Sequence, residues 1–218
     1  MRIVISGASG GIGAAMARKF LEAGYEVFGF DVLPAALSDD RYTHRILDVR
    51  DPIPAEEAAH IAPHVVVVSA GTIDEADAIS VNLEGAIRFT EAFLGSPALT
   101  SVLFVASASA RNGAEFPLYV ASKAGLVGYM KYLANDLGKR GITVNSISPG
   151  GVITPMNEHI LESPELYAAV LKETLLGKWA QPEEVADLAF FLTAQNRSIT
   201  GEDILMDNGE QLKSNFIW

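Results

Sequence analysis

Short apolar runs alternate along this chain with longer segments in which apolar residues recur every three or four positions. The short runs predict seven strands, at residues 2–6, 26–31, 44–49, 65–70, 102–107, 143–148 and 203–207. The periodic segments predict helices at residues 11–23, 81–94, 117–137 and 182–192. The valines at 65–68 and the run VLFVA at 102–106 are apolar on both faces, as are parallel strands that helices cover on both sides. The pattern therefore predicts an α/β fold with a doubly wound parallel sheet.

The composition fits one globular domain over residues 1–218. Hydrophobic residues make up 49% of the chain and charged residues only 20%, so a sizeable core is expected. No repeat, linker or change of composition marks a second domain. The net charge is −11, which is the wrong sign for binding nucleic acid or an anionic membrane surface. We therefore expect neither as a partner.

Three further features favour a cytoplasmic protein without a metal. The chain has no cysteine, which fits a reducing compartment. Its first apolar run stops at Ser6, too early for a signal-peptide core, and no apolar stretch approaches the roughly 20 residues that span a bilayer. His60 and His64 are four positions apart, but Pro63 interrupts a helix there and no third ligand is nearby, so we predict no metal site.

A glycine-rich turn joins the first predicted strand to the first predicted helix. Ser6 ends the strand, and Gly7, Gly11 and Gly13 follow it. Glycine lets backbone N–H groups approach an anion closely, and a helix N-terminus adds partial positive charge. A pyrophosphate is therefore predicted here, although a turn that merely packs tightly would show the same glycines.

An acidic residue at the second strand makes the ligand more specific. Asp31 ends that strand about twenty residues after the turn, where a carboxylate accepts hydrogen bonds from the adenosine ribose of a dinucleotide. A carboxylate there repels a 2′-phosphate, and no basic residue stands at Ser9 or Val32. The sequence therefore predicts NAD as the cofactor, with NADP disfavoured.

A tyrosine and a lysine share one face of the predicted helix at 117–137. Tyr119 and Lys123 are four positions apart, one helical turn. A tyrosine with a pKa near 10 is a poor base at neutral pH, and moving its pKa to about 7 takes roughly 4 kcal/mol of phenolate stabilisation. A neighbouring ammonium supplies such stabilisation, so the pair predicts general acid/base chemistry.

These motifs, in this order and over nearly the whole chain, resemble those of the classical short-chain dehydrogenase/reductase family. The family's glycine turn corresponds to Ser6 through Gly13, its Tyr-x-x-x-Lys to Tyr119 and Lys123, and its Pro-Gly segment to residues 149–154. The segment at 199–209 is similar to the family's last strand. The resemblance implies a single doubly wound, Rossmann-type domain with a seven-stranded parallel sheet that binds a nicotinamide cofactor.

The resemblance also implies roles for individual residues. Tyr119 would be the general acid/base, and Lys123 would bind the nicotinamide ribose and lower the tyrosine pKa. Ser107 would hydrogen-bond the substrate oxygen, and Asn82 would hold a water that relays protons to Lys123. Simple capping by Asn82 and strand-end hydrogen bonding by Ser107 are the alternatives. The cofactor site would consist of Gly7, Ser9, Gly11, Ile12, Gly13, Asp31, Asp48, Val49, Ala70, Gly71, Tyr119, Lys123, Pro149, Gly150, Val152 and Thr154.

The chain departs from the family pattern in three segments. The family's Asn-Asn-Ala-Gly is Val68-Ser69-Ala70-Gly71 here, so hydrogen bonding in this turn must differ. The segments 49–64 and 72–81 are shorter than the resemblance implies, which predicts stunted helices beside the fourth strand. A homo-oligomer, a dimer or a tetramer, is expected. Residues 155–178 would form a lid with an apolar wall over the substrate, and ordinary helix packing of the same apolar residues is the alternative. The apolar Phe216, Ile217 and Trp218 predict packing on the subunit itself or on a partner.

Together these features predict an oxidoreductase that transfers a hydride between NAD(H) and a secondary alcohol or ketone. Its small-molecule substrate would bind between Tyr119 and Ser107. An NAD(H)-binding regulatory or sensor protein on the same fold, without turnover, is the alternative. A sensor needs the glycine turn and Asp31 but has no use for the Tyr119 and Lys123 pair.

Overall fold

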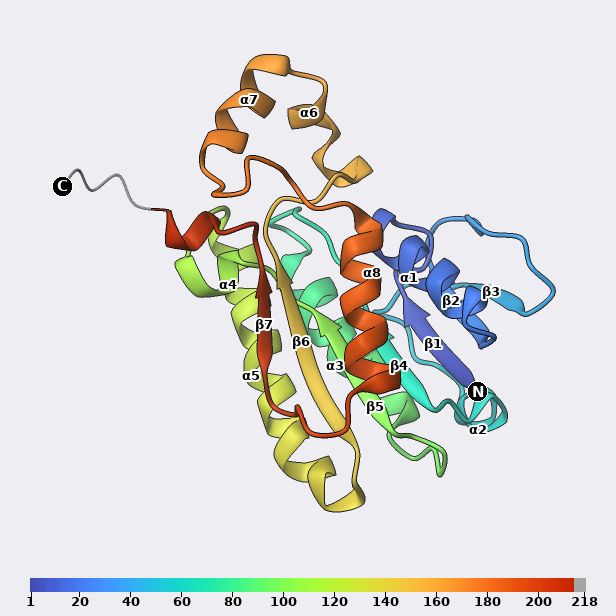
Figure 1. The fold of residues 1–218 in the computed structure, drawn as a ribbon. Helices are drawn as coiled ribbons and strands as arrows, with labels where there is room; N and C mark the ends of the chain where they lie inside the picture. The colour runs from blue at the N-terminus through green and yellow to red at the C-terminus, as the bar shows by residue number, and fades with distance from the viewer. Residues whose placement is uncertain (214–218) are drawn as a thin grey trace.

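Seven parallel strands form one sheet in the computed structural model, which describes residues 1–213. The strands are β1 (Arg2–Ser6), β2 (Glu26–Asp31), β3 (Tyr42–Ile46), β4 (Val65–Val68), β5 (Ser101–Val105), β6 (Thr143–Pro149) and β7 (Asp203–Met206). Their order in the sheet is β3-β2-β1-β4-β5-β6-β7 (Figure 1). The predicted fold class is therefore confirmed. The packing predicted for Phe216, Ile217 and Trp218 lies outside the described residues.

Helices cover both faces of the sheet because alternate strand residues point to opposite sides. In β1, Ile3 and Ile5 pack with α1 (Gly11–Glu22) and α8 (Pro182–Phe190), whereas Val4 packs on the other face. That second face carries α2 (Ala55–Ile61), α3 (Ala86–Phe93) and α5 (Pro117–Leu137). Both faces of the sheet are thus buried, which explains the continuous apolar runs of its central strands.

The other helical segments are short. They are η1 (Ser80–Gly85), a π-helical turn, and α4 (Ser109–Asn112), η2 (Gly138–Arg140), η3 (Pro155–Asn157), α6 (Glu158–Leu161), α7 (Pro164–Lys172), η4 (Phe191–Gln195) and η5 (Glu210–Leu212). The α2 helix has seven residues, as the trimmed segment before β4 predicts. Within the described part of the chain, no helix is both long enough and apolar enough to cross a membrane.

The third strand begins two residues and ends three residues earlier than the sequence predicts. Tyr42 pairs with Val27 and Ile46 with Asp31, so β3 ends where its partner β2 ends. Val49, included in the predicted strand at 44–49, is buried beyond the strand and contacts the position of Gly85. The apolar pattern in this segment reflects loop residues that pack on the core as well as the strand itself.

The strand order reverses next to β1, which pairs with β2 on one side and β4 on the other. At such a switch point the loops after neighbouring strands run in opposite directions and leave a crevice at the carboxyl edge of the sheet. A cavity of about 810 Å³ lies along this edge, lined by residues that follow β1, β2, β4, β5 and β6. The fold thus brings the predicted motifs to one place.

Candidate active site

The cavity gathers almost all of the predicted site residues. Asn82 is the one predicted site residue that does not line it. The glycine turn and Asp31 lie in the part of the wall that follows β1 and β2, and Ser107, Tyr119 and Lys123 lie in the part that follows β5 and in α5. One cavity can therefore hold both a dinucleotide and a substrate.

The glycine turn needs glycine for steric reasons. Gly7 has a φ of +71°, and a Cβ there would lie 2.6 Å from the Ala70 nitrogen. A Cβ at Gly13 would lie 1.9 Å from the Gly7 oxygen. At Gly10, the N-cap of α1, an added Cβ would meet only the Gly7 oxygen, at 3.6 Å. A Cβ at Gly11 would lie 2.6 Å from Thr154 Cγ2. The turn is therefore packed tightly on its inner side and against Thr154, and it is open at Gly10, just before the N-terminus of α1.

Asp31 is held in place by two backbone hydrogen bonds. Its Oδ2 accepts from the N–H of Ser9 and its Oδ1 from the N–H of Leu33, both at 2.9 Å. The Ser9 hydroxyl donates to the carbonyl oxygen of Pro34 at 2.7 Å, which ties the glycine turn to the loop after β2. The carboxylate is thus fixed beside the turn, and each oxygen keeps lone pairs for a further donor.

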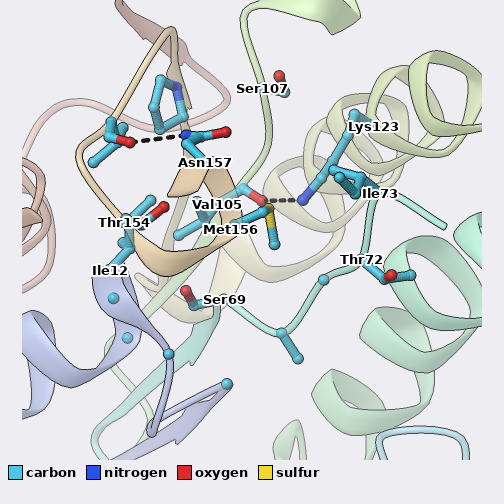
Figure 2. Close-up of a pocket in the computed structure, with 18 of the residues that line it drawn as sticks. Ile12, Ser69, Thr72, Ile73, Val105, Ser107, Lys123, Thr154, Met156 and Asn157 are labelled. Carbon is cyan, nitrogen blue, oxygen red and sulfur yellow. Dashed lines mark hydrogen bonds between the residues drawn. The ribbon is translucent and has the colours of Figure 1, made fainter. Parts of the chain in front are cut away.

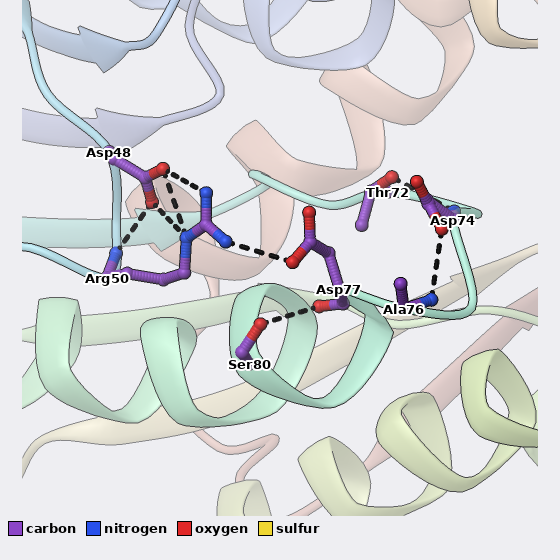
Figure 3. Close-up of polar contacts among 7 residues, drawn as sticks. All are labelled: Asp48, Arg50, Thr72, Asp74, Ala76, Asp77 and Ser80. Carbon is purple, nitrogen blue, oxygen red and sulfur yellow. Dashed lines mark hydrogen bonds and ion pairs between the residues drawn. The ribbon is translucent and has the colours of Figure 1, made fainter.

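Asp48 lies in the cavity wall with its carboxylate paired to Arg50. The Nε of Arg50 is 3.0 Å from one carboxylate oxygen, and its Nη2 is 2.6 Å from the other. The Arg50 guanidinium holds the pKa of Asp48 below its usual value. Nη1 of Arg50 pairs with Asp77 at 3.0 Å, so the guanidinium bridges the two shortened segments (Figure 3). The neighbouring Val49 turns its side chain into the core.

Tyr119 and Lys123 lie on the cavity wall from one face of α5. The Lys123 side chain is 5% exposed, and its Nζ donates to the carbonyl oxygen of Val105 at 2.9 Å (Figure 2). Burial lowers the pKa of Lys123 to about 8, although Glu115 raises it slightly. Burial raises the pKa of Tyr119 to about 12, with an opposing contribution from a hydrogen bond to Ser107. Desolvation of Tyr119 therefore outweighs the lowering of its pKa by Lys123 that the sequence predicts.

Ser107 is oriented by its neighbour two positions on. Its Oγ accepts hydrogen bonds from the N–H of Ser109 at 3.2 Å and from the Ser109 hydroxyl at 2.8 Å. Ser107 and Tyr119 both line the cavity, and the Ser107 hydroxyl opposes the rise of the Tyr119 pKa. Ser107 follows β5 and Tyr119 belongs to α5, so the pair forms only in the folded chain.

Asn82 braces the turn after β4. It is fully buried in the η1 turn, its Oδ1 accepts from the N–H of Thr72 at 2.8 Å, and its Nδ2 donates to the Thr72 carbonyl and to the Ser122 hydroxyl. A Cβ on Gly71 would lie 3.2 Å from Asn82 Oδ1 and 3.3 Å from Lys123 Nζ. The side chain is thus close to Lys123 and is hydrogen-bonded to the backbone of Thr72 and to the Ser122 hydroxyl.

Ser6 takes the place of the missing amides in the turn 68–71. Its hydroxyl accepts hydrogen bonds from the N–H groups of Ser69 at 3.2 Å and Ala70 at 3.3 Å. Because this chain has Val68-Ser69 where the family has two asparagines, different hydrogen bonding is expected in this turn, and Ser6 provides it. A serine at the end of β1 serves this turn because β1 and β4 are neighbours in the sheet.

The predicted lid supplies part of the cavity wall. Met156, Ile160 and Val170 line the cavity, as the predicted apolar wall requires. Two other apolar residues of the predicted lid do not line it: Leu166 is half exposed, and Tyr167 packs on Trp179. The sequence reasoning missed Trp179 and polar lining residues such as Asn112, Glu115, Asn157, Glu173 and Glu210. No local motif marks these residues, because they reach the cavity from separate loops and helices.

Comparisons with known proteins agree with this geometry. A family model described as Enoyl-(Acyl carrier protein) reductase matches residues 56–211. D-threitol dehydrogenase of Mycolicibacterium smegmatis is 30% identical over an alignment of 244 residues, which covers 96% of this chain and 92% of that protein. The alignment is longer than the chain itself, so the chain lacks residues that this relative has.

Two solved structures share the whole fold. A putative 2-deoxy-D-gluconate 3-dehydrogenase from Agrobacterium tumefaciens with bound NADP has a TM-score of 0.87 at 26% identity and covers 97% of this chain and 96% of its own. A 4-hydroxyisoleucine dehydrogenase complexed with NADH has a TM-score of 0.83 at 26% identity and covers 98% and 99%. The fold is a Rossmann-type fold, which these oxidoreductases share. The chain belongs to the short-chain dehydrogenase/reductase family.

Proposed function

We propose that this protein transfers a hydride between NAD(H) and a secondary alcohol or its ketone. The observation that carries the proposal is the meeting of Tyr119, Ser107 and Lys123 on one cavity wall, opposite an open glycine turn. A protein that only sensed NAD(H) would need the turn and Asp31 without this trio. Sugar and polyol dehydrogenases among its relatives support a hydroxyl-bearing small molecule as substrate.

The residues of the cavity fit a nicotinamide dinucleotide. The uncapped start of α1 and the glycine turn would hold the pyrophosphate, and Asp31 would accept hydrogen bonds from the adenosine ribose hydroxyls. Lys123 would bind the other ribose through N–H donors not used on Val105. When bound, the cofactor supplies the hydride acceptor or donor, which no side chain can provide.

The proton goes through the side chains of this chain. In alcohol oxidation, the ionised Tyr119 would take the hydroxyl proton while the hydride leaves the same carbon, and in ketone reduction Tyr119 would return that proton. Ser107 would donate a hydrogen bond to the substrate oxygen and hold it beside Tyr119. The Lys123 ammonium, one helical turn away, would stabilise the phenolate.

NAD is the proposed cofactor, with NADP disfavoured. A 2′-phosphate would meet the fixed Asp31 carboxylate, and the exposed Val32 and Leu33 beside it are apolar. Among the described residues that line the cavity, the basic ones are Arg50 and Lys123, and Arg50 is already paired with two carboxylates. We also propose that the protein forms a homo-oligomer, and light scattering of the purified protein would measure its mass in solution.

Fluorescence titrations with NADH and NADPH test the cofactor site without knowledge of the substrate. Tight binding that prefers NADH is expected. Reduction of NAD⁺ in the presence of 2-butanol, cyclopentanol or D-threitol then tests turnover. NADH binding without turnover of any alcohol or ketone would favour the sensor, and binding of neither nucleotide would contradict both.

A further inference from the structure

The shortened segment between β4 and α3 is tied to three different parts of the fold. Thr72 is hydrogen-bonded to Asn82. Asp77 is paired with Arg50 (Figure 3). Between Thr72 and Asp77 the chain makes a tight turn that Asp74 stabilises. The N–H of Asp74 donates to the Thr72 hydroxyl, and its Oδ1 accepts from the N–H of Ala76, both at 3.0 Å. In this turn the Glu75 side chain points to the beginning of α5, which is the third contact of the segment.

Glu75 caps the helix that carries the catalytic tyrosine. Its Oε1 accepts hydrogen bonds from the N–H groups of Leu118 and Tyr119, both at 3.1 Å, and its Oε2 lies 3.2 Å from the Leu118 nitrogen. The α5 helix begins at Pro117, and its N-cap Phe116 has no side-chain acceptor. The first N–H groups of a helix have no partner within the helix, so this distant carboxylate supplies the missing acceptor and also suits the helix dipole.

We infer that Glu75 is a positioning residue that fixes the first turn of α5 and thereby sets the place of Tyr119 beside Ser107. The inference rests on the proposed function. Glu75 does not line the cavity, so it acts only through the backbone of Tyr119.

The rest of α5 does not depend on this contact. Leu126, Met130, Leu133 and Leu137 are buried in the core, and Lys123 is held by Val105. Removal of Glu75 therefore frees the first turn and Tyr119 while the cofactor contacts of Lys123 and Asp31 stay in place. A loss of turnover at unchanged cofactor affinity separates positioning from general destabilisation.

Two variants and one matched control test this inference. Glu75→Ala removes the acceptor, and Glu75→Gln keeps a side-chain oxygen in reach of both N–H groups. Glu56→Ala removes the same charge from the first turn of another helix, α2, where Glu56 is exposed. The measurements are kcat with cyclopentanol and NAD⁺, the NADH dissociation constant, and amide hydrogen exchange at Leu118 and Tyr119.

Glu75→Ala should lower kcat by about tenfold or more, since small displacements of a reacting group cost that much. Its NADH affinity should stay within about twofold, and both amides should exchange about tenfold faster or more, because each has lost a hydrogen bond. Glu75→Gln should recover most of kcat, and Glu56→Ala should match the wild type.

Two results would overturn the inference while the wild type is active. One is a kcat of Glu75→Ala equal to that of the wild type, and the other is a parallel loss of turnover and NADH affinity. A wild type that binds NADH but turns over none of the alcohols contradicts the proposed function instead. The amide exchange still reports on Glu75 in that case, and unchanged protection in Glu75→Ala would refute its contact with α5.

Discussion

The Nζ of Lys123 lies 5.8 Å from the centre of the Tyr119 ring, and both groups are buried. Burial raises the tyrosine pKa to about 12 and lowers the lysine pKa to about 8. Bringing a tyrosine pKa from about 12 to about 7 takes roughly 7 kcal/mol. The proposed mechanism therefore requires phenolate stabilisation of this size when cofactor and substrate are bound.

Replacing Tyr119 by phenylalanine removes the hydroxyl that is proposed to accept the proton but leaves the cavity shape almost unchanged. Tyr119→Phe should lower kcat by at least about a hundredfold, the usual contribution of a positioned acid/base group. NADH affinity, measured by fluorescence titration, should stay within a few-fold. Near-normal turnover by this variant would exclude Tyr119 from the mechanism.

The buried Lys123 should make stability depend on pH. Its ordinary pKa of 10.5 falls to about 8 in the folded protein, so between these pH values the unfolded chain binds more protons than the folded one. Stability from this group therefore rises with pH from about 8 to 10.5 and is lowest below 8. Lys123→Met should stabilise the protein at pH 7 by up to about 3 kcal/mol and abolish turnover.

The control for that variant is Lys131→Met, an exposed lysine on the same helix, which should shift stability by less than about 0.5 kcal/mol. Urea unfolding at pH 7 and pH 10 measures both variants. Equal stability of Lys123→Met and the wild type at pH 7 would show that the ammonium is well solvated in the folded protein.

Asp31 should decide between the two nicotinamide dinucleotides. Asp31→Ala removes the repulsion of a 2′-phosphate and the acceptor for the ribose hydroxyls, so the ratio of NADPH to NADH dissociation constants should fall by about tenfold or more. Asp40→Ala, an exposed carboxylate near the end of the same loop, should leave the ratio unchanged. A ratio that Asp31→Ala does not alter would show that this carboxylate does not read the ribose.

Glu115 and Glu210 line the cavity, and their carboxylates should select against anionic alcohols. Burial raises the pKa of Glu115 and of Glu210, and the pKa of each is raised further by neighbouring carboxylates. One carboxylate close to an anion costs on the order of 1 kcal/mol even in water. The kcat/KM for 3-hydroxybutyrate should therefore be about tenfold or more below that for 2-butanol, and Glu115→Gln should narrow the gap. Equal values for the two alcohols in the wild type would contradict this.

The sequence by itself determined the architecture and most of the site. Strand and helix periods are local, and the glycine turn, Asp31, Tyr119 and Lys123 carry their chemistry in residue type and spacing. Because all strands are parallel, motifs that follow their carboxyl ends lie along one edge of the sheet. The prediction was less accurate at β3, because the apolar Val49 belongs to a loop that packs on the core and cannot be told from a strand residue by hydropathy.

Only the tertiary structure decided which side chains hydrogen-bond the backbone beside these motifs and hold it in place. Ser6 reaches the turn at Ala70 because β1 and β4 are adjacent, and Glu75 caps α5 from 43 residues away. No local pattern predicts either contact, since the partner in each case is a backbone N–H, which every residue except proline has. The direction of the Tyr119 pKa shift was likewise set by burial, a property of the whole fold that spacing along one helix does not contain.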